Sequence, residues 1–357
     1  MTTPLAHLTV VELASVLAGP SVGMFFAELG AEVVKIENAR TGGDVTRHWR
    51  APGETTEGLS AYYCSINYGK TVHLLDLQRA EDQRRVHELA TKADVVISNF
   101  QPRVAAKLRM DAITLRGLND RLIVAELIGF PDDPSRPAFD VVLQAESGFL
   151  YMNGEAGAAP VKMPVALIDV LAAHQLKEGI LLALLRRQQT GSGAHVRASL
   201  LEAALASLVN QANNYLMAGH IPQRMGSQHP NIAPYGDQFR TADEVAFVLA
   251  VGSDAQFAAL CACIQAAELA SDARFRTNPA RIHYRAALTA VLNKRFGSLP
   301  GDVLFARFRE RRVPYGRIRR MDEVLTHPVA QRMIRTETTA DGQPTRRLSG
   351  LGFRIKS

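Results

Sequence analysis

Asp169 is the residue whose type and position could most directly perform chemistry. It follows an apolar run in Pro164–Val170 (PVALIDV) and stands where a long amphipathic helix is expected to begin. A carboxylate there can act as an N-cap that accepts backbone N–H groups. The dipole of the helix is also expected to keep this carboxylate ionised at pH 7. Nucleophilic attack on an activated acyl group requires an ionised, positioned carboxylate, so a structural and a chemical interpretation are both open.

Other nucleotide and hydrolase motifs are missing from the sequence. The loop Ala14–Pro20 (ASVLAGP) follows the first expected strand, and Glu37 at the end of the second could hold a ribose. The loop lacks G-x-G-x-x-G, and Pro20 removes a backbone donor that a pyrophosphate would use, so a nicotinamide cofactor is not expected. There is no triphosphate-binding or nucleophile-elbow motif. The histidines and cysteines show no metal-ligand spacing, so no metal is expected.

The elements that must position Asp169 alternate between strands and helices. Thr9–Leu13 and Glu32–Glu37 are expected strands, and Ser21–Leu29 between them is an expected helix. This alternation predicts an α/β fold with a parallel sheet. Asp169 should open a helix that runs to about Gln188. The further expected strands are Thr71–Leu77, Asp94–Asn99, Leu122–Ile128 and Val196–Ser199.

The pattern breaks at Gly219–Tyr235, which holds three prolines and has no apolar period. We interpret this segment as a linker or an active-site loop. Glu244–Val251 resumes as a strand, and helical spacing follows in Asp254–Gln265 and beyond. The residues therefore predict a larger N-terminal α/β domain and a smaller α+β domain after about residue 225.

The composition is that of an ordinary globular protein of 357 residues, with 47% hydrophobic and 21% charged residues. No apolar run reaches the roughly 20 residues of a membrane-spanning helix, so no membrane association is expected. The chain shows no export signal, and three cysteines are too few for a disulfide framework, so we expect a reducing, cytoplasmic location. The net charge of +6 comes from short, mixed basic runs, which favour solvated surface over nucleic-acid binding but suit a polyphosphate substrate.

Several segments together resemble the class III CoA-transferases, the CaiB/BaiF family of formyl-CoA and carnitine-type enzymes. Each segment alone is weak, but they occur in the family's order over nearly the whole chain. The segments that carry the resemblance are Leu13–Pro20, Leu29–Glu37, Gly42–Arg47, Asn67–Leu77, Ala93–Pro102, Phe139–Ala145 with Ser147 and Gly148, Asp169, Arg186–Val196 and Val313–Val324.

The resemblance implies a large Rossmann-like α/β domain made from both ends of the chain and an interlocked homodimer. It assigns 1–205 with 325–357 to the large CoA-binding domain, 206–235 to a linker and 236–324 to the small domain. It makes Asp169 the nucleophile, which passes through an aspartyl–acyl anhydride and an aspartyl–CoA thioester. The substrates are then an acyl-CoA and a carboxylic acid, with no cofactor beyond CoA and no metal.

The resemblance also suggests residues that would bind CoA. Val16, Leu17 and Ala18 are expected at its adenine end, while Asn99 and Phe100 shape the path of the pantetheine. Phe139 is the aromatic residue expected beside the nucleophile. The cations expected near the CoA phosphates or in the opening motif are Arg40, Arg47, Lys70, Arg103 and Lys107. For each cation a solvated surface charge is the competing interpretation.

Two alternatives to a transferase remain at this stage. The related acyl-CoA racemases place a histidine before the aspartate that corresponds to Asp140, and Phe139 stands there instead; a phenylalanine cannot titrate, which disfavours two-base chemistry. A non-catalytic CoA-binding homologue is the other alternative, against which the intact Asp169 argues. The segment around His229 and Pro234–Gly236 resembles family members that use succinyl-CoA and short dicarboxylates, and it could also cover the reaction intermediate.

Overall fold

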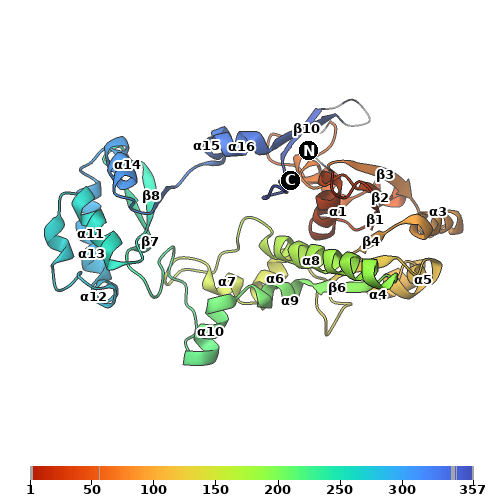
Figure 1. Cartoon of the computed structure of the whole chain (residues 1–357), viewed down its shortest axis with the longest axis horizontal. Coiled ribbons are helices and arrows are strands. Elements are labelled where there is room, and N and C mark those ends of the chain that lie inside the picture. Colours follow the sequence, from red (N-terminus) through yellow and green to blue (C-terminus); the bar gives the residue numbers. More distant parts are fainter. Residues whose placement is uncertain (1–2, 56, 339–341, 343, 356–357) are drawn as a thin grey trace. The chain divides into compact units, whose positions relative to one another are not determined.

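The computed structural model describes residues 3–55, 57–338, 342 and 344–355. The chain forms two compact units. Unit 1 contains Met1–Leu150, Lys162–Ile221 and Pro328–Ser357, and unit 2 contains Tyr151–Val161 and Pro222–His327. Both ends of the chain belong to unit 1, as Figure 1 shows. Unit 2 is therefore inserted into unit 1 at two places.

Unit 1 is built on a six-stranded sheet whose strands are all parallel, in the order β3-β2-β1-β4-β5-β6. This order reverses between β1 and β4, and in such sheets ligands bind beyond the carboxyl ends of the strands at the point of reversal. The α/β prediction with a parallel sheet is thereby confirmed. The strands are β1 (Thr9–Leu13), β2 (Glu32–Asn38), β3 (Lys70–Leu75), β4 (Val95–Ser98), β5 (Ile123–Ile128) and β6 (His195–Ser199).

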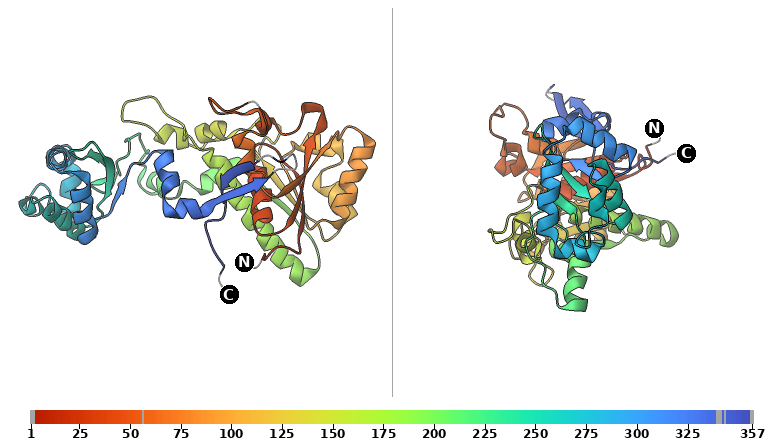
Figure 2. Two further views of the ribbon diagram at one scale, coloured as in Figure 1. Left: turned by 90° about the horizontal axis from the view of Figure 1, so that it is seen from above. Right: turned by 90° about the vertical axis from the view of Figure 1, so that its left-hand side faces the viewer.

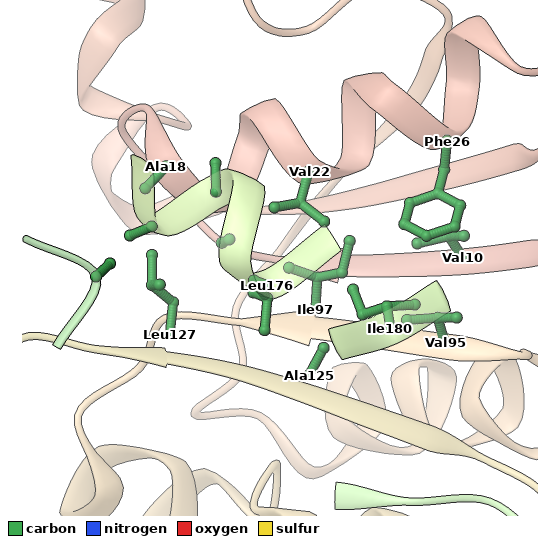
Figure 3. Packing of buried hydrophobic residues seen from close by; sticks show 14 of the residues in the cluster. Val10, Ala18, Val22, Phe26, Val95, Ile97, Ala125, Leu127, Leu176 and Ile180 are labelled. Atoms are coloured by element: carbon green, nitrogen blue, oxygen red, sulfur yellow. The ribbon is translucent and has the colours of Figure 1, made fainter. Parts of the chain in front are cut away.

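One face of this sheet is covered by α1 (Ala18–Glu28) and α8 (Leu167–Thr190), which pack on each other and on the strands. Figure 3 shows Val22 and Phe26 of α1 and Leu176 and Ile180 of α8 directed at sheet residues such as Ile97. These side chains are fully buried. Burial on both faces explains why the central strands are nearly continuous runs of valine and isoleucine.

The opposite face is covered by α3 (Ala80–Lys92) and α5 (Ala112–Leu118), with α4 (Pro102–Leu108) beside them. Val86 and Ala90 of α3 and Leu115 of α5 pack on Val11 and Val96 of the strands. The left view of Figure 2 shows the orange helices on the other side of the sheet from the green α8. Helices on both faces complete the doubly wound arrangement.

Short elements surround the carboxyl ends of the strands. The 3-10 helices η1 (Ala39–Thr41) and η2 (Val45–His48) and the helix α2 (Ala61–Cys64) lie between β2 and β3, while α6 (Asp140–Glu146) follows β5. After β6 come α9 (Leu200–Ala206) and α10 (Val209–Ala218). Since α10 is helical, it occupies part of 206–235, the segment assigned to a linker.

The end of the chain returns to unit 1 as α16 (Pro328–Met333) and the antiparallel strands β10 (Ile334–Thr338) and β11 (Pro344–Leu348). The Arg347 guanidinium donates to Glu28 Oε1 at 2.6 Å, and the Gly350 N–H donates to the same carboxylate. Both side chains of this ion pair are almost fully buried. The C-terminal segment is therefore anchored to the end of α1.

Unit 2 joins a three-stranded antiparallel sheet to a helical layer. The sheet contains β7 (Tyr235–Arg240), β8 (Ala246–Ala250) and β9 (Tyr315–Arg317). The helices and 3-10 helix are α7 (Phe149–Met152, which straddles the boundary), α11 (Asp254–Cys263), η3 (Ala267–Ala270), α12 (Asn278–His283), α13 (Arg285–Phe296), α14 (Gly301–Glu310) and α15 (Met321–Thr326). Phe239, Phe247, Phe296 and Phe308 meet edge-on or tilted in its core, an arrangement that aromatic rings prefer.

Among the helices that the structure describes, none combines the length and apolar character needed to cross a membrane.

Candidate functional site

Asp169 is the third residue of α8, and its side chain is 9% exposed. The N-cap of the helix is Ala166, so the expectation that Asp169 itself caps the helix is wrong. Among the described residues, no group donates a hydrogen bond to the Asp169 carboxylate, which lines a cavity instead. A buried carboxylate without a hydrogen-bonded partner is free to react.

Both oxygens of the neighbouring carboxylate, Asp140, accept hydrogen bonds. Its Oδ1 accepts the backbone N–H of Ile168 at 2.8 Å, and its Oδ2 accepts Nε2 of Gln144 at 2.6 Å. Ala166 has no side-chain acceptor, so Asp140 supplies the cap of α8 from the start of α6. The two carboxylates at this helix end therefore have different roles, since one holds the backbone and the other faces the cavity.

Burial and, to a smaller extent, the nearby charge of Asp140 together raise the pKa of Asp169 to about 7. The helix dipole does not compensate for the loss of water around the carboxylate. The expectation of a carboxylate kept ionised at pH 7 is therefore corrected, because a pKa of about 7 places its titration near neutral pH. A carboxylate that titrates near neutrality is a stronger base and nucleophile than an exposed one.

The cavity at Asp169 has a volume of about 260 Å³. It is walled by the loops after β1, β4 and β5 and by the start of α9. Phe139 is half exposed at its edge, and Arg136 is its one positively charged wall residue within the described part of the chain. Arg136 stacks on the Phe130 ring at 4.1 Å and pairs with Glu146 at 2.5 Å. The predicted residues on this wall are Val16, Leu17, Ala18, Asn99, Phe100, Phe139 and Asp169.

A larger cavity of about 650 Å³ adjoins the first, because Ser15 and Phe100 line both. It lies beyond the carboxyl ends of β1, β2, β3 and β4, at the point where the strand order reverses. Of the predicted cations, Arg40 and Lys107 line it. Through the shared residues Ser15 and Phe100, the walls of the two cavities connect Arg40 and Lys107 with Asp169.

The loop between β1 and α1 lines both cavities and is held from several sides. Val16 has φ 73°, a conformation that is strained for a β-branched residue. Its N–H donates to the Asp44 carboxylate at 3.2 Å, and Asp44 in turn pairs with the Lys35 ammonium. Asn99 binds both N and O of Ser15 through its side-chain amide. The loop is therefore fixed by side chains from β2, the loop after it and β4.

Three of the predicted cations lie outside the cavity walls. Lys70 is fully buried against Glu12 at 2.8 Å, and burial lowers its pKa to about 8. The Arg47 guanidinium donates to the Glu37 carboxylate and to the Tyr63 hydroxyl. The Tyr63 hydroxyl also donates to Glu37, so the carboxylate that could have held a ribose already has internal partners. Arg103 is exposed on α4. These three predictions are corrected, because the first two side chains have internal partners and the third points to solvent.

Sequence reasoning missed the groups that support the site: Lys35, Asp44, Asp140, Gln144, Arg136 and Tyr62. Burial raises the pKa of Tyr62 to about 12, with a smaller contribution from the Asp169 charge, which shows that the two groups are electrostatically coupled. Asp44, Asp140 and Gln144 occur within the quoted motifs, so the available signal was the presence of polar residues inside apolar or glycine-rich stretches. Tyr62 and Arg136 gave no such signal.

The expected covering loop at 227–236 belongs to unit 2 and is internally fixed. Asp237 accepts from the Tyr235 N–H and the Gln228 amide, and Arg285 donates to the carbonyls of His229 and Ile232. The His229 and Tyr235 rings meet at 5.1 Å. The segment is therefore an ordered loop with its own hydrogen-bonded frame.

The chain matches known proteins over nearly its whole length. The model of CoA-transferase family III matches residues 5–356. The chain is 36% identical over 346 residues to a succinate–glutarate CoA-transferase of Agrobacterium fabrum, covering 95% of this chain and 86% of the relative. It is 30% identical over 328 residues to a human succinyl-CoA:glutarate CoA-transferase, covering 91% and 74% of the two chains.

A solved structure shares the fold. The crystal structure of a CaiB/BaiF family protein from Brucella suis is 36% identical and superposes with a TM-score of 0.87. The match covers 99% of this chain and 93% of that one.

Proposed function

Since this chain belongs to CoA-transferase family III and is a CoA-transferase, we propose that Asp169 is the covalent nucleophile of the transfer. The observation that carries this proposal is the placement of an unbonded, buried carboxylate in a cavity that adjoins a larger, cation-lined one. The relatives exchange CoA between acids, and that reaction needs a group able to hold an acyl fragment while CoA is detached.

The first half of the reaction detaches CoA from the donor. An Asp169 oxygen attacks the thioester carbonyl carbon, the C–S bond breaks, and CoA leaves as thiolate, which produces an aspartyl–acyl anhydride. The thiolate then attacks the Asp169 carbonyl and releases the donor acid, leaving an aspartyl–CoA thioester. One thioester has replaced another, so no outside energy source is required.

The second half repeats these steps with the acceptor. The acceptor carboxylate attacks the aspartyl thioester and expels CoA thiolate, which then attacks the acceptor acyl carbon and frees Asp169. The charge of Asp140 favours the attack of Asp169 on the donor thioester, because converting Asp169 into a neutral acyl derivative relieves the repulsion between the two carboxylates.

We place CoA along the two adjoining cavities. The phosphates would lie in the larger cavity near Arg40 and Lys107, and the pantetheine would pass Ser15 and Phe100 to reach Asp169. Val16, Leu17 and Ala18 line the Asp169 cavity, which fits the thioester end of CoA and not the adenine end expected from the sequence.

We further propose that the donor and acceptor are short dicarboxylic acids, as the names of the relatives suggest. Arg136 lowers the electrostatic cost of bringing an anionic acid close to Asp140 and Asp169. An interlocked homodimer, a cytoplasmic location and the lack of a metal or second cofactor are further parts of the proposal, and they rest on the resemblance and the sequence. Light scattering on the purified protein tests the dimer.

The decisive experiment uses Asp169→Ala and Asp169→Asn with labelled acyl-CoA and free acid. Loss of exchange in both variants is expected, together with a hydroxylamine-trapped acyl group on wild-type Asp169 located by mass spectrometry. Near wild-type exchange in either variant would show that the mechanism is wrong. A panel of short dicarboxylates and monocarboxylates with succinyl-CoA tests the substrate class, and turnover with monocarboxylates alone would contradict it.

A further inference from the structure

Gln144 has a fully buried side-chain amide that bonds at both ends. Its Nε2 donates to Asp140 Oδ2 at 2.6 Å, and its Oε1 accepts the backbone N–H of Met163 at 2.9 Å. Met163 precedes α8 by a few residues, and Asp140 caps that helix. The glutamine therefore connects α6 to the chain entering α8 and to the cap of α8.

The Met163 N–H fixes the orientation of this amide. If the amide were flipped, its nitrogen would face a second donor and its oxygen would face the Asp140 carboxylate, so both contacts would be repulsive. With the observed orientation, each Asp140 oxygen accepts one N–H, from Gln144 and from Ile168. Asp140 is thereby held as an acceptor, with no freedom to turn toward the cavity.

We propose that Gln144 is a positioning residue, which acts through Asp140 to fix the first turn of α8 and hence the carboxylate of Asp169. Asp169 follows Ile168 directly, so any displacement of the capped N–H moves the nucleophile with it. This inference rests on the proposed role of Asp169. Gln144 itself does not line the cavity. It would act by fixing the position of the reacting Asp169 oxygen and the distance between the Asp140 and Asp169 carboxylates.

The experiment compares Gln144→Leu with a matched control, Ser147→Ala. Ser147 is the buried C-cap residue of α6 and donates to the Leu143 carbonyl, and its hydroxyl makes no hydrogen bond to the described residues of α8 or to Asp140. Gln144→Leu loses two buried hydrogen bonds and Ser147→Ala loses one, so the melting temperature should fall further in Gln144→Leu, and kcat is compared at a temperature at which both variants are folded. Gln144→Leu should lower kcat roughly 10- to 100-fold, because small misplacements of a reacting group have large effects. Ser147→Ala should change kcat by no more than about twofold.

Two further measurements separate positioning from general damage. The KM for acyl-CoA should change little in Gln144→Leu, since the CoA walls are untouched, and single-turnover formation of the hydroxylamine-trapped acyl-enzyme should slow as much as kcat. Gln144→Glu is the second variant, because it keeps the shape and the acceptor for Met163 while placing an anion against Asp140. It should fold and show the same loss of kcat at pH 8.

The outcomes are distinct. Equal kcat losses in Gln144→Leu and Ser147→Ala, or wild-type kcat at pH 8 in Gln144→Glu, would overturn the positioning role. A wild-type protein that forms no acyl-enzyme and exchanges no CoA would instead overturn the proposed function. If Gln144→Leu does not fold, Gln144→Glu carries the comparison alone.

Discussion

The buried Lys35 ammonium lies 3.2 Å from Asp44 Oδ2, and that carboxylate holds the N–H of Val16 in a left-handed backbone conformation. Lys35 also donates to Glu12 and to the Ala14 carbonyl. The Lys35–Asp44 pair thus holds the loop between β1 and α1 at two points, the Ala14 carbonyl and the Val16 N–H. A buried ion pair seldom adds stability compared with apolar residues, but removing one partner leaves an uncompensated charge.

We expect Asp44→Ala to lower the free energy of unfolding by roughly 3–5 kcal/mol, because Lys35 loses a buried partner and Val16 loses its acceptor. Urea denaturation measures the change. Glu268→Ala is the control, since it removes one partner of an exposed pair with Arg295 in unit 2 and should change stability by less than about 1 kcal/mol. Similar small losses in both variants would contradict the structural role of the Lys35–Asp44 pair.

The rate should depend on pH through Asp169. Because burial raises its pKa to about 7, the ionised nucleophile accumulates as the pH rises through that value, and kcat/KM should rise with it. Asp140→Asn keeps an oxygen for the Ile168 N–H but removes the charge, so the midpoint should move to lower pH. Asp133→Asn, which removes an exposed carboxylate from the loop that precedes α6, is the control. An unchanged midpoint in Asp140→Asn would contradict the coupling.

Asp169 should destabilise the fold at alkaline pH. Its pKa lies near 3.8 in the unfolded chain and about 7 in the native protein, so the native state binds the proton more tightly. The penalty is absent below pH 3.8, grows as the pH rises and is complete above 7, with an upper bound on the order of 4 kcal/mol. Asp169→Asn should therefore raise the melting temperature more at pH 8 than at pH 5. Calorimetry at both values tests this, and an equal change would refute it.

The cations of the larger cavity should act on CoA and not on the acyl group. Arg40→Gln and Lys107→Gln are each expected to raise the KM for acyl-CoA roughly tenfold with little change in kcat, since they would hold phosphates away from the reacting atoms. Acyl-pantetheine, which lacks the nucleotide, should show no such increase. Arg103→Gln is the control because this arginine is exposed and lines neither cavity. Equal effects on both thioesters would rule out phosphate binding.

The sequence predicted the elements of unit 1 well because each has a strong local pattern. The strand Thr9–Leu13 has the predicted bounds, and α8 (Leu167–Thr190) extends two residues beyond the predicted helix 169–188 at each end, since a buried run of β-branched residues and a helical period are readable from neighbours alone. The helix Asp140–Glu146 was not predicted, although it carries two residues of the candidate site. It is short, and it is held by contacts to the distant α8 that no local pattern records.

The sequence was sufficient to predict the reactive residue of the candidate site, but not the residues that hold it and set its pKa. Asp169 and the loops around it were identified, but the protonation of Asp169 depends on burial and on Asp140, which lies far away in the sequence. Lys70 shows the opposite error. A lysine in a glycine-containing motif suggests phosphate binding, while its position beside Glu12 is fixed by the pairing of strands, which brings separate segments together.

The C-terminal segment is anchored at Glu28, so the contacts of α1 form in a set order during synthesis. The ribosome delivers the six strands of the parallel sheet before Pro222–His327 of unit 2, and only afterwards Arg347, whose guanidinium donates to Glu28 of α1. A nascent chain stalled inside unit 2 therefore carries a carboxylate at the end of α1 that still awaits this partner. The helix α1 therefore acquires this contact only after residue 347 has been synthesised.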